Sequence, residues 1–85
     1  MQLIERAVEV NALFEPSAAA LLVQTASKFS SRITLNQAEK TANAKSIMGI
    51  ISLDIQSGQI ITITADGDDE QQAVPALETF LRPSA

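Results

Sequence analysis

The chain of 85 residues contains neither histidine nor cysteine, so two of the side chains that most often perform chemistry at neutral pH are missing. Histidine is the usual general base in that range, and a cysteine thiolate is the usual soft nucleophile. A zinc site would lack both of its preferred ligands, and no disulfide can form. Gly49, Gly58 and Gly67 are too scattered to build a phosphate-binding loop. The composition predicts a protein with no catalytic residues, no metal and no cofactor.

Two polar residues stand where helices are expected to begin. Glu15 comes before Pro16, which suits the first turn of a helix, and Ser46 comes before isoleucines at helical spacing. Serine is a favoured N-cap residue, worth about 1 kcal/mol, because its hydroxyl accepts a backbone N–H. A carboxylate at such a position gains about 0.3–1 kcal/mol from the helix dipole. On spacing alone, these structural roles account for both residues.

A run of acidic residues near the C-terminus could suggest a cation site. Its members are Asp66, Asp68, Asp69 and Glu70. Calcium needs about six or more oxygen ligands in a defined loop, and this spacing does not match the EF-hand pattern. Aspartate favours turns, and carboxylates are stabilised at the start of a helix. We therefore expect a turn and a capped helix here rather than a metal site.

Charge and hydropathy narrow the class of protein. Six basic and ten acidic residues give a net charge of -4 without a basic cluster, which argues against direct binding to nucleic acid. Apolar residues make up 46% of the chain and aromatic residues only 4%, so we expect one aliphatic core and a single domain over residues 1–85. The first residues carry charges, and no apolar run reaches the roughly 20 residues that span a bilayer. We expect a cytoplasmic protein that does not bind the membrane.

Apolar spacing predicts four strands and three helices. The expected order is a strand at 4–10, a helix from Pro16 that ends at Ser30, strands at 32–36 and 40–44, a short helix from Ile47, a strand at 60–65 and a helix from 70 to about 82. This mixture predicts an α+β fold, with the helices on one face of a four-stranded, mainly antiparallel sheet.

The helical spacing also predicts which residues are buried. The expected apolar face of the first helix is Ala18, Leu21, Leu22, Ala26 and Phe29, and that of the last helix is Ala73, Ala76, Leu77 and Phe80. Arg6 falls on the apolar face of the first strand, so either it extends past a sheet edge or a bulge shifts the register. Pro75 costs about 3 kcal/mol inside a helix, so either the last helix kinks or its regular part begins near Pro75. We prefer the kink, because good helix formers precede Pro75.

Two segments resemble a known family. Residues 43–53 closely resemble the regulatory serine segment of HPr, the small histidine-containing phosphocarrier of the bacterial sugar phosphotransferase system. Residues 22–29 are similar to the first helix of that family, and both segments fall at family-like positions without gaps. The resemblance implies the HPr-like open-faced sandwich, whose order of elements is the order predicted above.

The resemblance places Glu15 at the position of the phosphorylated histidine. The family pattern is His-Ala-Arg-Pro-Ala, whereas this chain has Glu15-Pro16-Ser17-Ala18-Ala19, so the family arginine is replaced by Ser17. This implies loss of the phosphocarrier step and of contacts that depend on the arginine. Glu15 could mimic a permanently phosphorylated state, but we prefer the simpler interpretation of a solvated carboxylate stabilised by the helix dipole.

Ser46 gains a regulatory interpretation from the same resemblance. The pattern Lys-Ser-Ile-Met-Gly-x-x-Ser-Leu is the target of HPr kinase/phosphorylase in this family, and it begins here at Lys45. Histidine-lacking members of the catabolite-repression type keep the serine and, when phosphorylated, assist a catabolite control repressor. The resemblance thus implies a bacterial regulatory phosphoprotein of carbon catabolite repression that has these two proteins as partners.

A partner-binding surface is also implied, because the short helix after the serine carries an exposed apolar patch in this family. The residues expected to form this surface are Phe14, Ser17, Lys45, Ile47, Met48 and Ile51. Leu13 would extend it. Met48 and Phe14 are expected at the surface and Ile50 in the core. Lys45 is expected to be solvated, although it could pair with a phosphate on Ser46.

Three functions stay open at this point. The first is the regulatory partner just described, and the second is phosphoryl transfer in the sugar phosphotransferase system through Glu15. The third is a diverged scaffold module that needs neither phosphate. A monomer or a weak homodimer is expected, because strand exchange and pairing of apolar patches both suit a small sandwich.

Overall fold

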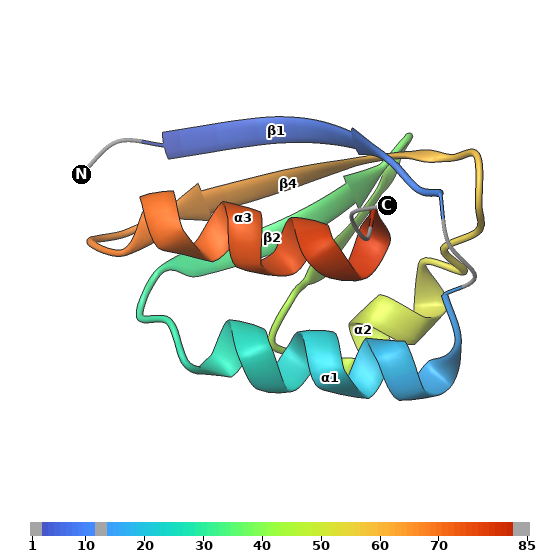
Figure 1. The fold of residues 1–85 in the computed structure, drawn as a ribbon, viewed down its shortest axis with the longest axis horizontal. Helices are drawn as coiled ribbons and strands as arrows, with labels where there is room; N and C mark the ends of the chain where they lie inside the picture. Colours follow the sequence, from blue (N-terminus) through green and yellow to red (C-terminus); the bar gives the residue numbers. More distant parts are fainter. Residues whose placement is uncertain (1–2, 12–13, 83–85) are drawn as a thin grey trace.

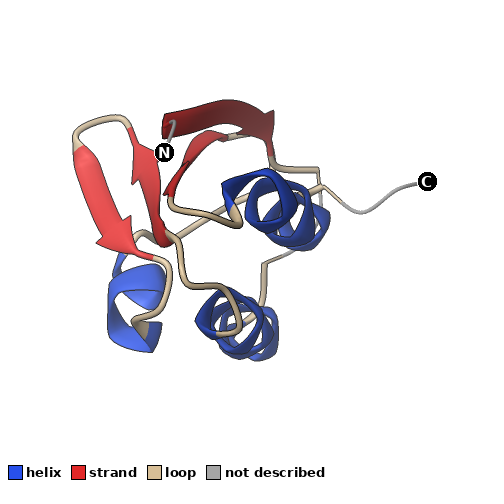
Figure 2. Ribbon diagram, turned by 90° about the vertical axis from the view of Figure 1, so that its left-hand side faces the viewer, coloured by secondary structure: helices blue, strands red, loops and turns tan. Residues whose placement is uncertain are grey.

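The computed structural model describes residues 3–11 and 14–82 and shows helices packed on one face of a twisted sheet (Figures 1 and 2). In chain order the elements are β1 (Leu3–Glu9), α1 (Pro16–Ser27), β2 (Arg32–Gln37), β3 (Lys40–Asn43), α2 (Ile47–Ser52), β4 (Ile60–Asp66) and α3 (Glu70–Leu81). All strand pairs are antiparallel, in the order β1-β4-β2-β3. The predicted α+β open-faced sandwich is confirmed.

The sheet has one buried and one open face because apolar and polar residues alternate along its strands. In β4, Ile61, Ile63 and Ala65 are buried against the helices, whereas Thr62 and Thr64 lie on the open face and are only half-buried. Side chains of alternating residues point to opposite faces of a sheet, so this alternation fixes which face the helices cover. The result is one aliphatic core between the sheet and the three helices.

Arg6 extends past an edge of the sheet. The pairing of β1 with β4 runs without interruption from Leu3 opposite Asp66 to Glu9 opposite Ile60, so no bulge shifts the register. Because β1 is an edge strand, the guanidinium of Arg6 leaves the apolar face and donates to Oε1 of Glu78 in α3 at 2.7 Å. Of the two alternatives for Arg6, the edge position is correct.

The buried face of α1 differs from the prediction. The structure buries Ala19, Leu22 and Ala26, while Leu21 is 52% exposed and Ala18 only half-buried. Phe29, just after the helix, packs against the core from its edge. Six consecutive apolar residues at 18–23 make this helix apolar around most of its circumference, so spacing alone did not select the face.

Pro75 lies within α3 and does not delay it. The helix begins at Glu70, five residues before Pro75, and continues to Leu81, so the alternative of a later start is wrong. Pro75 cannot donate to the carbonyl of Gln71, but both residues are exposed, and water can satisfy that carbonyl. Ala73 and Leu77 are buried as expected, Val74 and Leu81 are buried in addition, and Ala76 and Phe80 are only half-buried.

The acidic turn before α3 joins two distant loops. The Asp69 carboxylate makes no cap bond to α3. It accepts instead from the backbone N–H of Ser30 at 2.8 Å, from that of Ser31 at 3.0 Å and from the Ser31 hydroxyl. A Cβ on Gly67 would lie 2.5 Å from the Ser31 Cα, so only glycine permits this close approach. The expected turn is confirmed, but Asp69, which occupies the N-cap position of α3, does not cap the helix with its side chain.

None of the helices within residues 3–11 and 14–82 is long and apolar enough to cross a membrane. The same described residues contain no group of three or more carboxylates that could hold a metal ion.

Candidate functional site

The residues singled out from the sequence lie at the start of α1 and along α2, two helices that contact each other beneath the sheet (Figure 1). We call the exposed part of these elements the α1–α2 surface and define it by Glu15, Ser17, Ser46, Met48 and Ile51. Helix α1 contains no charged residue between Pro16 and Ser27, and neither does α2 between Ile47 and Ser52. Within both helices this surface is therefore uncharged, and its one carboxylate, that of Glu15, lies at the margin.

Ser46 is the N-cap of α2, as predicted. Its extended backbone, with φ -114° and ψ 113°, lets the hydroxyl oxygen accept the backbone N–H of Gly49 at 3.3 Å. The backbone N–H of Ser46 donates to the carbonyl of Asn43 at 3.0 Å, which fixes the cap to the end of β3. The Ser46 side chain is half-buried, so its hydroxyl lies at the edge of the protein rather than inside it.

Helix α2 divides its apolar residues between core and solvent. Ile50 is 1% exposed and packs in the core, whereas Met48 is 72% exposed, and both placements were predicted. Ile47 and Ile51 are also classed among the exposed large apolar residues. A six-residue helix lying on the core can bury only one side, so the other side presents apolar groups to solvent.

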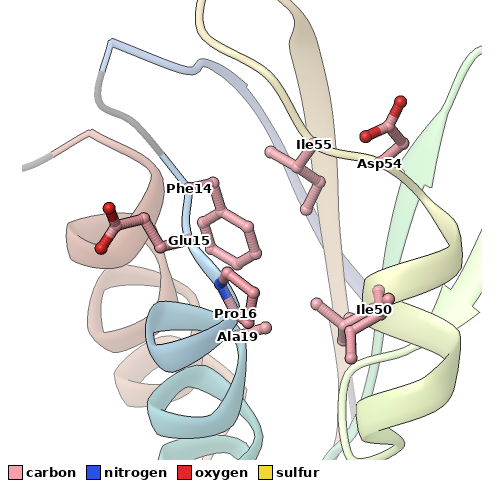
Figure 3. Close-up of a pocket in the computed structure, with 8 residues that line it drawn as sticks. Phe14, Glu15, Pro16, Ala19, Ile50, Asp54 and Ile55 are labelled. Atoms are coloured by element: carbon pink, nitrogen blue, oxygen red, sulfur yellow. The ribbon is translucent and has the colours of Figure 1, made fainter.

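Phe14 was expected at the surface, and this expectation is wrong. Its ring is half-buried and packs against the core cluster, facing Ile50 and Ile55 (Figure 3). A large aromatic ring beside an open core edge gains more from apolar contact than from exposure. Leu13, which was expected to extend the patch, lies outside the described residues.

The start of α1 carries no cation. Glu15 occupies the N-cap position with φ -83° and ψ 163°, but its exposed carboxylate makes no cap hydrogen bond. Pro16 follows at the first helical position, as predicted, and Ser17 is exposed in the first turn. The carboxylate thus lies beside the positive end of the α1 dipole, the position where an acidic residue is favoured.

Lys45 is not freely solvated, contrary to the expectation. Its Nζ donates to the carbonyl oxygen of Phe29 at 2.8 Å, and its backbone N–H donates to Oδ1 of Asn43 at 2.8 Å. The side chain is half-buried and links the turn after α1 to the segment before α2. Sequence reasoning missed this contact, because Phe29 is 16 residues away along the chain.

A cavity of about 200 Å³ opens between the start of α1 and the end of α2 (Figure 3). Its walls are Phe14, Pro16 and Ala19 on one side and Ile50, Ile51 and Ile55 on the other, with Glu15 and Asp54 at its edges. Asp54 has a left-handed backbone with φ 51°, which lets the chain turn sharply after α2. No pattern in the sequence indicated this cavity, since its two sides are separated by some thirty residues of chain.

Fold and site together define a small α+β open-faced sandwich that presents exposed apolar side chains on α2. The model of the family described as the PTS HPr component phosphorylation site matches residues 14–82. The chain therefore belongs to the HPr family, and the resemblance found from the sequence is confirmed.

Curated relatives include the HPr-like protein Crh of Halalkalibacterium halodurans and that of Bacillus subtilis. The first is 44% identical over 81 residues, which cover 93% of this chain and 96% of the relative. The second is 44% identical over 64 residues, which cover 75% of each chain. This protein is thus HPr-like and similar to the Crh regulatory type.

Solved structures agree with this assignment. The phosphocarrier protein HPr of Bacillus anthracis superposes with a TM-score of 0.90 at 39% identity, covering 96% of this chain and all (100%) of that one. The crystal structure of Bacillus subtilis Crh, described as an intertwined dimer with a swapped domain, gives a TM-score of 0.77 at 35% identity. That match covers 100% of this chain and 95% of the other.

Proposed function

We propose that this protein is a non-catalytic regulatory member of the HPr family that acts by protein–protein binding in carbon catabolite regulation. The support begins with a composition that contains no histidine, so no phosphohistidine can form. The similarity to Crh, a catabolite-repression protein in Bacillus subtilis, adds the biological setting. In this proposal Glu15, at the family's histidine position, serves as a fixed negative charge and not as a phosphoryl acceptor.

The observation that carries the proposal is the position of Ser46 beside an exposed apolar helix. Its hydroxyl caps α2 two residues before Met48, the most exposed large apolar side chain among the described residues. Transfer of the γ-phosphoryl group of ATP to Ser46 Oγ would release ADP and a proton. It would add a charge of about -1.5 to -2 beside the apolar patch. The patch would then offer a partner both apolar contact and a phosphate.

The proposed partners are HPr kinase/phosphorylase, which would modify Ser46, and a catabolite control repressor, which would bind the modified form. Ile47, Met48 and Ile51 supply the apolar contact and Ser17 a polar one. Phe14 contributes from the edge of the cavity. Lys45, the residue before the cap, contributes from the position in which its ammonium donates to the Phe29 carbonyl.

Incubation with HPr kinase and ATP, followed by intact-mass spectrometry, tests this proposal. We expect the wild-type chain to gain the mass of one phosphoryl group and Ser46→Ala to gain none. Ser52→Ala is the matched control, because its hydroxyl lies on the same helix and donates to the Gly49 carbonyl. An unmodified wild-type chain beside a phosphorylated HPr in the same reaction would contradict the proposal.

A second candidate is phosphoryl transfer through Glu15, which is favoured by one observation only, the exposure of its carboxylate at the N-cap of α1. Incubation with phosphoenolpyruvate and Enzyme I separates the two functions. Regulation predicts no label on the chain, whereas transfer predicts label that is lost in Glu15→Gln. A stable partner complex that is insensitive to Ser46→Ala would instead indicate a scaffold module.

A further inference from the structure

The cavity between α1 and α2 takes no part in the helix cap or in the proposed phosphorylation of Ser46. We propose that it receives an arginine side chain of the partner protein, with the aliphatic stem in the cavity and the guanidinium at its acidic rim. This inference rests on the proposed function, because it names the chemistry of the partner at the same surface.

The size of the cavity favours a single side chain. Its volume of about 200 Å³ is below the roughly 300–1,000 Å³ typical of pockets for small-molecule ligands. Three of its lining residues, Ala19, Ile50 and Ile55, are buried, and the Phe14 ring forms part of one wall. An extended hydrocarbon stem fits such a surface, since long charged side chains bury their methylene groups and keep the charged head in water.

The charge at the rim selects the head group. Among the described residues that line the cavity, Glu15 and Asp54 are the ionisable ones, and both are acidic. Figure 3 shows their carboxylates at opposite edges, turned away from the apolar side chains. Lys45, which precedes α2, is held on the Phe29 carbonyl and does not line the cavity. A cationic head leaving the cavity would therefore find only acidic residues at its edges, whereas an acidic head would be repelled.

Arginine suits this rim better than lysine. Its planar guanidinium presents five N–H donors in a fork that matches carboxylates, and it is more weakly hydrated than an ammonium group. It can also stack on an aromatic ring, which Phe14 provides at the wall. Binding of the isolated side chain is expected to be weak and sensitive to salt, because both carboxylates lie in solvent.

A titration of the ¹⁵N-labelled full-length chain tests the inference directly. The probe is N-acetyl-arginine N-methylamide, and its neutral match is the corresponding citrulline compound. We expect the amide signals of Glu15, Ala19 and Ile55 to shift with the arginine probe and to saturate in the millimolar range. The citrulline compound should bind about two- to fivefold more weakly, the difference expected for an exposed ion pair.

Conservative variants test whether the two carboxylates contribute to binding of the arginine probe. Glu15→Gln and Asp54→Asn should each weaken binding of the arginine probe about twofold or more, and added salt should remove the difference. Asparagine tolerates the left-handed backbone at position 54, so the fold is retained. Glu39→Gln is the matched control, because Glu39 is an exposed carboxylate in the β2–β3 turn and does not line the cavity.

Three outcomes would overturn the inference: no shift at the cavity residues, equal binding of the citrulline compound, or unchanged binding by the Glu15→Gln/Asp54→Asn double variant. Tighter binding of the matching lysine probe would overturn the choice of arginine. The titration uses unphosphorylated protein and is repeated with Ser46→Ala. A failed titration would therefore not contradict a positive kinase assay. A negative kinase assay would likewise not contradict binding seen in the titration.

Discussion

At the N-terminus of α3, one carboxylate joins two turns that are far apart in the chain. The Ser31 hydroxyl is the main cause that lowers the pKa of Asp69 below its ordinary value, followed by the backbone N–H of Ser30. Partial burial opposes this shift of the pKa, and the Ser31 backbone N–H adds to it. Glu70 is only 5% exposed, and its Oε1 accepts the backbone N–H of Gly67 at 3.0 Å. Each carboxylate therefore satisfies hydrogen-bond donors of the surrounding turns.

These hydrogen bonds predict a dependence of stability on pH. Because the pKa of Asp69 is lowered in the folded state, its contribution is complete above the unfolded pKa of about 4 and is lost as pH falls through the folded pKa. Asp69→Asn should lower Tm at neutral pH, since its amide N–H groups face backbone donors. The difference from wild type should shrink in acid.

Thermal unfolding followed by circular dichroism between neutral and strongly acidic pH measures this difference. Asp68→Asn, at the exposed neighbouring position, is the control and should leave Tm nearly unchanged. A Tm difference for Asp69→Asn that stays constant down to the lowest pH would show that the ionised Asp69 carboxylate does not contribute this stability.

Among the elements, α1 shows how tertiary contacts select one face of an apolar helix. Leu21 and Leu22 are adjacent in sequence and equal in helix propensity, yet one is 52% exposed and the other 0% exposed. The choice follows from the contacts of α1 with both α2 and α3, which together leave one stripe of the helix facing the sheet. The exposed Leu21 then adds an apolar side chain to the outside of α1, which the sequence had assigned to the core.

Alanine substitution at the two leucines tests this assignment. Leu22→Ala should destabilise the fold by about 2–5 kcal/mol, because it leaves a cavity in a closed core. Leu21→Ala should change the free energy of unfolding by less than about 0.5 kcal/mol, as an exposed substitution does. Urea unfolding followed by circular dichroism is the suitable measurement, since the chain has no tryptophan or tyrosine. Equal losses at the two positions would contradict the face that the structure buries.

For the molecule as a whole, β1 is the element best placed to exchange between copies. It is an edge strand, and within the described sheet its one neighbour is β4. If β1 moved to a second copy, it would make the same pairs with β4 and the same Arg6–Glu78 ion pair there. The swapped domain described for Bacillus subtilis Crh shows that a relative with this fold does exchange a segment.

We predict a weak homodimer formed by strand exchange, with the monomer dominant in dilute solution. Exchange requires the seven residue pairs between β1 and β4 to open, so monomer and dimer should interconvert slowly and separate as two peaks in size-exclusion chromatography with light scattering. Pairing through Met48 would instead give one rapidly averaging peak that Met48→Gln abolishes. A constant mass of one chain at every concentration would contradict dimerisation.

The sequence by itself determined the features that depend on neighbouring residues. These are the cap formed by Ser46, the start of α1 after Glu15 and the alternation that builds the sheet. Each involves contacts within about four residues or a spacing repeated along one element. Together with the family resemblance, they were enough to predict the fold.

Only the tertiary structure decided the features that join distant segments. Lys45 reaches a carbonyl 16 residues away, and Asp69 reaches an amide 38 residues away, so neither partner could be read from local spacing. The burial of Phe14, the exposure of Leu21 and the cavity beneath Glu15 have the same origin. Which apolar or charged group is buried depends on which element packs against it, and the packing of α1 on α2 and α3 is fixed only when the chain has folded.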